Sequence, residues 1–164
     1  MLGLFGKYKR YPGFVFLAVL LGFWGGAVSA GTVLTLENPK DDIRIELSEE
    51  DLLAFPQVVV STENEFVDGM AEFSGPLARD ILSLLGDDFD SAEFTAINDY
   101  SIVIPVSDFQ EYDVILALTM NGQKFSLRDK GPIWLIYPMS DHKELQDRVY
   151  NNRLIWQLTR ITAR

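Results

Sequence analysis

The chain has 164 residues, no cysteine, one histidine and a formal net charge of −10. Without cysteine it can form no disulfide, thiolate nucleophile or cysteine-ligated metal site, and any Ser-His-Asp triad would depend on His142 alone. Three of the 14 basic residues and none of the 24 acidic residues lie in the first thirty, so residues 31–164 carry 11 against 24, a net charge of −13. Such a surface repels nucleic acid and anionic lipid and does not help to capture phosphorylated ligands.

Residues 1–30 have the pattern of a signal peptide. Three basic residues precede the apolar run FVFLAVLLGF, and the small residues AVSA end at Ala30. This pattern predicts cleavage after Ala30 and a periplasmic or secreted domain over residues 31–164, with no membrane insertion after cleavage. The apolar run is shorter than the roughly 20 residues that a spanning helix needs, and an uncleaved N-terminal anchor is the alternative.

The first elements of the predicted domain are a helix, a strand and a second helix. Ser48–Phe55 is a short helix that Ser48 caps, with Asp51 in the position of a capping box. The β-branched run Gln57–Thr62 predicts a buried strand. The next helix is predicted to have Pro76 at its first position and Gly86 just past its end.

Strands dominate the second half. The expected strands are Glu93–Asn98, Ser101–Val106, Asp113–Met120, Ile133–Tyr137 and Arg153–Thr162. Asn121-Gly122 predicts a type I′ hairpin turn, and Asp141–Tyr150 a polar helix or turn. Because the helices are interspersed irregularly among the strands, the pattern predicts a single α+β domain with a mixed β-sheet.

Two groups of residues raise the question of a metal. The acidic stretch GDDFDSAEF could hold Ca²⁺, but its spacing is not that of an EF-hand loop, so a solvated loop is expected. His142 has no second histidine and no cysteine beside it, which favours a surface position. No metal site is therefore predicted.

The basic and aromatic residues of the second half are weighed in the same way. Lys124, Arg128 and Lys130 lie beside the hairpin, where they either form a local anion site or pair with surface carboxylates. Trp134 and Trp156 fall in apolar runs, for which core packing is the expectation.

The corner Asn98-Asp99-Tyr100 separates two predicted strands. A turn role is expected for Asp99. The Tyr100 hydroxyl, at the tip of such a corner, could face a ligand pocket.

Ordered motifs from Ala96 to Ile161 resemble the molybdopterin-binding domain of sulfite-oxidase-type oxidoreductases. These motifs are AINDYSIVIP, LALTMNG, DKGPIWLIYP and IWQLTRI, with FSGPLARDILSLLG upstream. The resemblance implies that family's fold. It also gives Asn121-Gly122 and the two prolines that bound the strand Ile133–Tyr137 scaffold roles.

The same resemblance implies a cofactor site that has lost several of its groups. The family's metal-binding cysteine falls at Ser61 or Thr62, and a soft thiolate is what ties its metal to the protein. The positions of its arginine, histidine and lysine are taken by Trp134, by a residue near Asp129 and by Ile155, whereas Tyr100 is retained. The candidate pocket residues are Ser61, Thr62, Asn98, Asp99, Tyr100, Arg128, Lys130 and Trp134.

These observations lead to two expectations of different kinds. The first is a non-catalytic accessory or sensory module without a cofactor, which binds a small organic ligand or a periplasmic or membrane protein partner. An assembly protein that offers only an interface is not distinguished from it. The second is a molybdopterin-dependent oxidoreductase in which Ser61 or Thr62 supplies an oxygen ligand and Tyr100 and Arg128 face the substrate.

Overall fold

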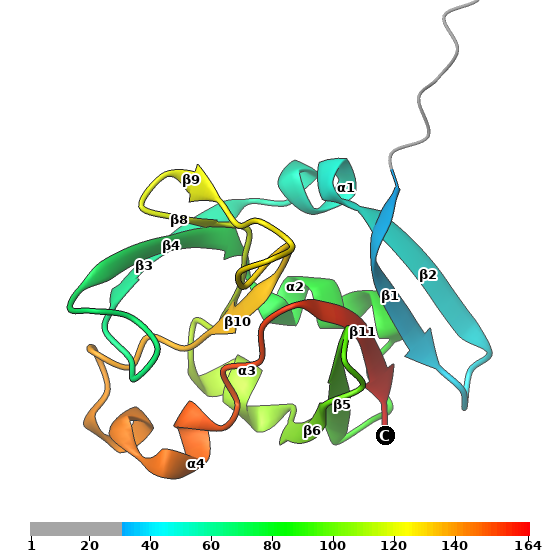
Figure 1. The fold of residues 1–164 in the computed structure, drawn as a ribbon. Helices are drawn as coiled ribbons and strands as arrows, with labels where there is room; N and C mark the ends of the chain where they lie inside the picture. The colour runs from blue at the N-terminus through cyan, green and yellow to red at the C-terminus, as the bar shows by residue number, and fades with distance from the viewer. Residues whose placement is uncertain (1–30) are drawn as a thin grey trace, which may run out of the picture.

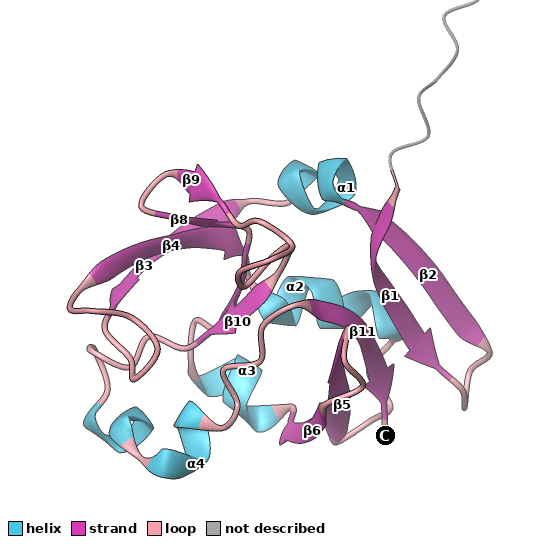
Figure 2. Ribbon diagram, viewed as in Figure 1, coloured by secondary structure: helices cyan, strands magenta, loops and turns pink. Residues whose placement is uncertain are grey.

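The structure is a computed structural model that describes residues 31–164. The predicted signal peptide therefore lies outside the described residues. Strands alternate with short helices around one core, which confirms the predicted single α+β domain (Figures 1 and 2). Within residues 31–164, no helix is long and apolar enough to cross a membrane.

A five-stranded mixed sheet forms one side of the domain, in the order β2-β1-β11-β5-β6. Its strands are β1 (Thr32–Asn38), β2 (Ile43–Ser48), β5 (Ser91–Ala96), β6 (Ser101–Pro105) and β11 (Leu158–Ala163). The central pair, β1 and β11, is parallel, and the other neighbours are antiparallel.

Two smaller sheets form the other side of the domain (Figure 1). One has four strands in the order β3-β4-β8-β9, namely β3 (Gln57–Thr62), β4 (Ala71–Pro76), β8 (Thr119–Met120) and β9 (Gln123–Lys124). The other pairs β7 (Ile115–Ala117) with β10 (Trp134–Ile136). Asn121 and Gly122 join β8 to β9 with φ of 49° and 75°, which confirms the predicted turn.

The helices are short; two lie in the middle of the domain, and the first and last helices lie on opposite sides of it, at the top and the lower left of Figure 2. They are α1 (Glu49–Ala54), α2 (Ala78–Leu82), α3 (Ser107–Glu111) and α4 (Arg148–Asn151), with 3-10 turns η1 (Ser83–Leu85) and η2 (Lys143–Gln146). The Ser48 side chain accepts from the Asp51 amide, and Asp51 accepts from the Ser48 amide, so the predicted capping box is confirmed.

The core is densest where β7 and β10 cross the middle of the domain. Every residue of both strands is buried. Strand β4 approaches β7 closely at Gly75, where an added Cβ would lie 1.9 Å from the Leu116 carbonyl oxygen. Only glycine, which has no Cβ, permits this close approach of the two backbones.

Several predicted boundaries were wrong for identifiable reasons. Pro76 ends β4 instead of starting a helix, and Leu77 is the N-cap of α2. Strand β3 was predicted as buried, but it lies at a sheet edge and only Val60 and Thr62 of its residues are buried. The strand expected over 113–120 divides into β7 and β8, which belong to different sheets.

The last strand was also predicted to start too early, at Arg153 instead of Leu158. Gln157 has φ of 52°, so the backbone before it cannot continue the extended strand. Strands β1 and β2 were not predicted at all. The shortened last strand matters most, because it leaves Trp156 in an irregular segment beside the pocket described below.

Candidate functional site

The turn between β5 and β6 is held by its own backbone and one amide side chain. The Ala96 amide donates to the Tyr100 carbonyl at 2.9 Å, and the Asp99 amide donates to the Ala96 carbonyl at 3.1 Å. The Asn98 Oδ1 accepts from the Tyr100 amide at 3.2 Å. Asp99 has φ of 64°, a conformation typical of turns, and Tyr100 is left half exposed at the tip.

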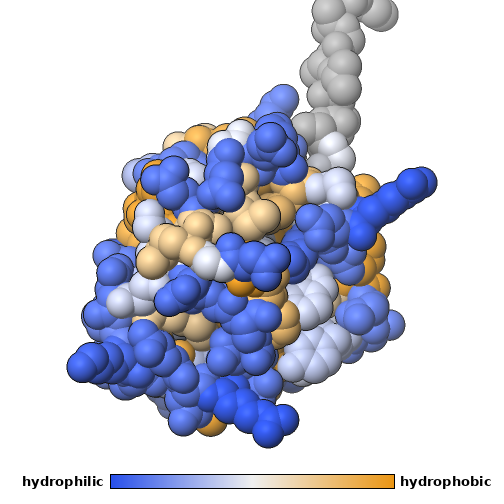
Figure 3. Space-filling model, turned by 60° about the vertical axis from the view of Figure 1, so that its left-hand side comes forward, coloured by the Kyte–Doolittle hydropathy of each residue, from blue (hydrophilic) through white to orange (hydrophobic). Residues whose placement is uncertain are grey.

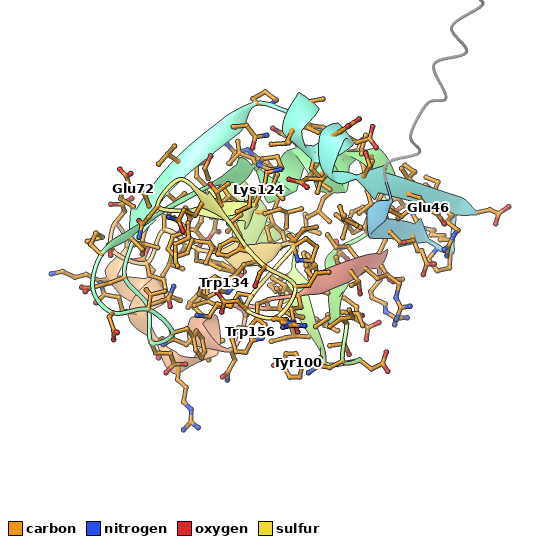
Figure 4. The ribbon with its side chains drawn as sticks, turned by 45° about the horizontal axis from the view of Figure 1, so that its top comes forward. Glu46, Glu72, Tyr100, Lys124, Trp134 and Trp156 are labelled. Atoms are coloured by element: carbon orange, nitrogen blue, oxygen red, sulfur yellow. The ribbon has the colours of Figure 1, made fainter. Side chains whose placement is uncertain are left out.

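A pocket of about 270 Å³ opens beside this turn. Three segments far apart in the sequence form it: the loop between β3 and β4, the β5–β6 turn, and the chain after α4. The lining residues are Phe66, Ala96, Asn98, Tyr100, Asn151, Asn152, Leu154, Ile155 and Trp156. Figure 4 shows Trp134, Trp156 and Tyr100 following one another from the interior toward the surface.

Aromatic rings form one corner of the pocket. The rings of Phe66 and Trp156 meet at 70° with centroids 5.0 Å apart. Trp134 lies behind them, 6.3 Å from Trp156, and its Nε1 donates to the Leu154 carbonyl at 3.2 Å. Trp134 is fully buried, as predicted, but Trp156 is 37% exposed and does not belong to the core. An aromatic corner of this kind suits the face and edge of another flat ring.

The polar side chains of the pocket are uncharged. Asn98, Asn151 and Asn152 contribute to the lining, and none of the lining residues carries a charge. The Oδ1 atom of Asn151 is buried and has no hydrogen-bond partner among the described residues. An unpaired buried acceptor costs about 1–3 kcal/mol in stability.

A buried ion pair supports the wall that carries these amides. Asp108 pairs with Arg153 and also accepts from the Tyr137 hydroxyl at 2.7 Å. Arg153 lies between Asn152 and Leu154, and its guanidinium covers the Tyr150 ring at 4.8 Å. Burial, followed by the charge of Asp108, raises the pKa of Tyr137 well above its usual range. This network fixes the chain between α4 and Trp156.

Ser61 and Thr62, the predicted oxygen ligands, do not line the pocket. Thr62 is fully buried. Its Oγ1 donates to the Glu63 carbonyl at 3.2 Å and accepts from the Ser140 amide at 3.1 Å. Ser61 points to the exposed side of β3. The Thr62 hydroxyl is therefore occupied in joining β3 to the segment around Ser140.

The predicted cations are also outside the pocket lining. Lys130 Nζ donates to the Phe66 carbonyl at 3.1 Å and lies 4.8 Å from the centre of the Trp134 ring. It therefore supports the loop that carries Phe66. Arg128 lies in an exposed turn, and Lys124 pairs with Glu49.

The acidic stretch and His142 take part in separate surface contacts. Asp88 pairs with Lys40, and Glu93 pairs with Arg164, whose guanidinium holds the pKa of Glu93 below its ordinary value. His142 Nδ1 lies 3.6 Å from the Glu144 carboxylate. Within residues 31–164, no group of three or more histidine, aspartate or glutamate side chains is arranged to hold a metal ion.

Sequence reasoning found Asn98 and Tyr100 but missed most of the pocket. Phe66 is the one aromatic residue in the polar loop ENEFVDG, and an isolated aromatic residue in such a loop can be recognised from the sequence as a candidate. Asn151 and Asn152 are adjacent in the sequence, and this pair of amides can be recognised there as well. Nothing local indicates that these two segments meet, because tertiary packing alone brings them beside Trp156.

The residues present do not fit the complete molybdopterin cofactor that the resemblance implies. The chain has no thiolate for the metal, and the Thr62 hydroxyl at the corresponding position bonds to neighbouring residues. No lysine or arginine lines the pocket to receive a phosphate. The aromatic corner and the amides fit a flat ring system instead.

Comparison with known proteins bears on the fold. No protein-family model matches the sequence, and no curated protein matches it. The crystal structure of the sulfane dehydrogenase SoxCD from Paracoccus pantotrophus is similar with a TM-score of 0.60 at 15% sequence identity; the match covers 79% of this chain and 37% of that one. This chain thus spans little more than a third of that protein's length. At this identity the likeness concerns the fold alone.

Proposed function

We propose that residues 31–164 form an exported, non-catalytic binding module that holds a small, flat, uncharged heterocycle in the pocket beside Tyr100. The observation that carries the proposal is the lining itself. Aromatic rings and amide side chains meet there, and no charged side chain takes part. Pockets for small organic ligands typically combine apolar walls with a few polar groups that fix orientation.

The aromatic rings of the pocket offer surfaces on which a ligand can stack. Phe66 and Trp156 offer a face and an edge at 70°, and Tyr100 is half exposed at the opposite tip. Stacking of a heterocycle on such side chains contributes on the order of 1–3 kcal/mol per ring. The amides of Asn98, Asn151 and Asn152 then supply polar groups that fix the ligand's orientation.

The resemblance suggests which heterocycle to test first. Of the positions that it assigns to the cofactor, Tyr100 and Ile155 line the pocket, and Trp134 lies against Trp156. The groups that are missing are those implied for metal and anion binding. The molybdopterin cofactor contains a pterin ring, which is flat and has N–H donors. A free pterin without metal or phosphate is therefore the ligand class that we propose.

Binding without chemistry points to an accessory or sensory role. A module of this kind would act by presenting its ligand-bound form to a periplasmic or membrane partner. The signal-peptide pattern of residues 1–30 supports the exported location.

The alternative is a molybdopterin-dependent oxidoreductase with an oxygen ligand from Ser61 or Thr62. Only the fold similarity favours it. The bonding of Thr62 to Ser140 argues against it, since a ligand hydroxyl would have to leave both of its present partners.

The test uses protein exported and purified without denaturation from its own type of host. Molybdenum and tungsten are measured by elemental analysis, and released pterin is measured by fluorescence after oxidation. The proposal expects pterin without stoichiometric metal, or an empty protein that takes up added pterin with quenching of Trp156 fluorescence. Near-stoichiometric metal would overturn it, as would a folded protein that binds no pterin.

A further inference from the structure

A second hollow lies on the other side of the β5–β6 turn from the pocket. It is a shallow groove of about 490 Å³. Its apolar lining includes Val33, Ile97, Leu127 and Pro132. Ile97 is 60% exposed and Leu127 67%, the largest exposed fraction of any large apolar side chain in residues 31–164.

Exposed apolar side chains also occur elsewhere, at Val59 and Met70, but Ile97 and Leu127 line the same groove. Figure 3 shows one face of the domain on which hydrophilic residues cover most of the area around a smaller apolar region. Two long aliphatic side chains from separate loops, gathered at one groove and bordered by acidic residues, are typical of an interaction surface. Single exposed apolar residues need no such explanation, but a shared groove does.

The charge around the groove specifies the partner. Glu49 and Glu50 line it, and no lysine or arginine does. Glu49 pairs with Lys124, whereas Glu50 has no ion pair among the described residues. With a net charge of −13 for residues 31–164, a second copy of the chain would be repelled. A segment with aliphatic side chains flanked by lysine or arginine fits both the apolar lining and the acidic border.

One residue joins the groove to the pocket. The Gln157 carbonyl accepts from the Ile97 amide at 2.9 Å, and the Gln157 Nε2 donates to the Leu127 carbonyl at 2.7 Å. Gln157 directly follows Trp156, which lines the pocket. Ile97 stands between Ala96 and Asn98, which line the pocket as well. The backbone of the same two segments therefore forms a wall of both hollows.

We propose that this groove is the docking surface for an aliphatic, basic-flanked segment of a partner protein. We further propose that a ligand in the pocket changes the affinity for that segment through Gln157 and the β5–β6 turn. The second statement rests on the proposed function, whereas the first does not. A movement of Trp156 on ligand binding would reach Leu127 through a single residue.

Docking is tested by photo-crosslinking in the native host. A photoreactive amino acid replaces Leu127 or Ile97 in the full chain, and the matched control replaces Val59, which is 61% exposed on the edge strand β3. We expect one partner protein to crosslink at 127 and 97 but not at 59. The contact should map to an aliphatic segment flanked by basic residues. No crosslink, equal crosslinking at 59, or a crosslink to a second copy would overturn the proposal.

The coupling is tested with a synthetic peptide of the mapped segment. Its affinity is measured with and without a saturating free pterin, and we expect a change of at least about fivefold. Gln157→Ala should reduce that change while Trp156 fluorescence still reports pterin binding. If pterin binds and the peptide affinity stays constant, the coupling is wrong. If pterin does not bind, the proposed function fails and takes the coupling with it, while the crosslinking result still decides the docking.

Discussion

The two parts of the expected cofactor site differ in one respect that decides their roles. At the end of β3, the hydroxyl of Thr62 is buried and fully hydrogen-bonded to neighbouring residues. At the β5–β6 turn, Tyr100 and Trp156 are partly exposed, and the Asn151 Oδ1 is left without a partner. The first part is closed by its own structure, whereas the second exposes aromatic side chains to solvent.

The difference follows from what each kind of side chain requires. A buried polar group needs a hydrogen-bond partner within the protein, since an unpaired one is costly. Thr62 has its partners in Ser140 and Glu63. The aromatic corner has no such requirement, because rings pack equally well with or without a metal beside them.

Removing the support of the pocket should have the largest effect. Asp108→Ala leaves Arg153, whose side chain is only 16% exposed, without its partner, and the Tyr137 hydroxyl without its acceptor. We expect a loss of about 3–5 kcal/mol of unfolding free energy, measured by denaturant titration. Asp108→Asn should lose less, because it still accepts from Tyr137. An equal loss in both variants would show that the lost charge accounts for the whole effect and that the bond from the Tyr137 hydroxyl contributes nothing.

The second effect separates the two tryptophans. Trp156→Ala should lower the affinity for a free pterin by about 10- to 100-fold with little change in stability, because a stacking surface is lost from a partly exposed position. Trp134→Phe should instead reduce stability, since Trp134 is fully buried. Isothermal titration and thermal unfolding measure the two quantities. A similar pattern in both variants would contradict the distinction between pocket and core.

A smaller effect is expected at the closed end. Thr62→Val keeps the side-chain volume but removes both hydrogen bonds to Ser140 and Glu63, at a cost of about 1–2 kcal/mol in unfolding free energy. Pterin affinity should not change, and Ser61→Ala should alter neither quantity beyond about 0.5 kcal/mol. If Thr62→Val abolished ligand binding, the closed end would belong to the site after all.

Asn151 should show two effects of opposite sign. Asn151→Leu removes an unpaired buried acceptor, so stability should stay constant or rise by up to about 1 kcal/mol. The same variant should bind pterin about 5- to 10-fold more weakly, because an amide of the pocket lining is lost. Asn152→Leu is the matched control from the same wall. A loss of stability in Asn151→Leu would indicate that the amide already has a partner.

The smallest effect is a loss of unfolding free energy in alkaline solution. The pKa of Tyr137 is raised in the folded protein, chiefly by burial, above its ordinary value of 10.0. The unfolded chain therefore ionises first, and the stability linked to Tyr137 is complete below that value and is lost as the pH rises further. At pH 10 the loss should stay below about 0.5 kcal/mol. Tyr137→Phe should flatten this dependence in denaturant titrations, and an unchanged slope would count against the assigned shift.

Local features of the sequence were the most predictable. The capping box at Ser48 and the turn at Asn121 depend on residues within a few positions of one another, and both are observed. Strand β3 was found but its burial was misjudged, because whether a strand is central or at an edge depends on the sheet around it. Gln157 adopts a positive φ that only its tertiary bonds to Ile97 and Leu127 explain.

The site was predicted only in part, because most of its residues come together through tertiary packing. The resemblance indicated Tyr100 through a motif that is local in the sequence. Trp156 was assigned to the core because apolar runs favour burial, and the sequence does not show where the chain leaves the strand. The acceptor on Asn151 and the ring of Phe66 become neighbours of Tyr100 only after the whole domain has folded.

The central position of β11 also constrains how the domain folds. Strand β1 lies between β2 and β11, so the first strand of the described chain finds its second neighbour only at residues 158–163. Pairings so distant in sequence form slowly. The five-stranded sheet cannot be completed on a growing chain before these residues are synthesised.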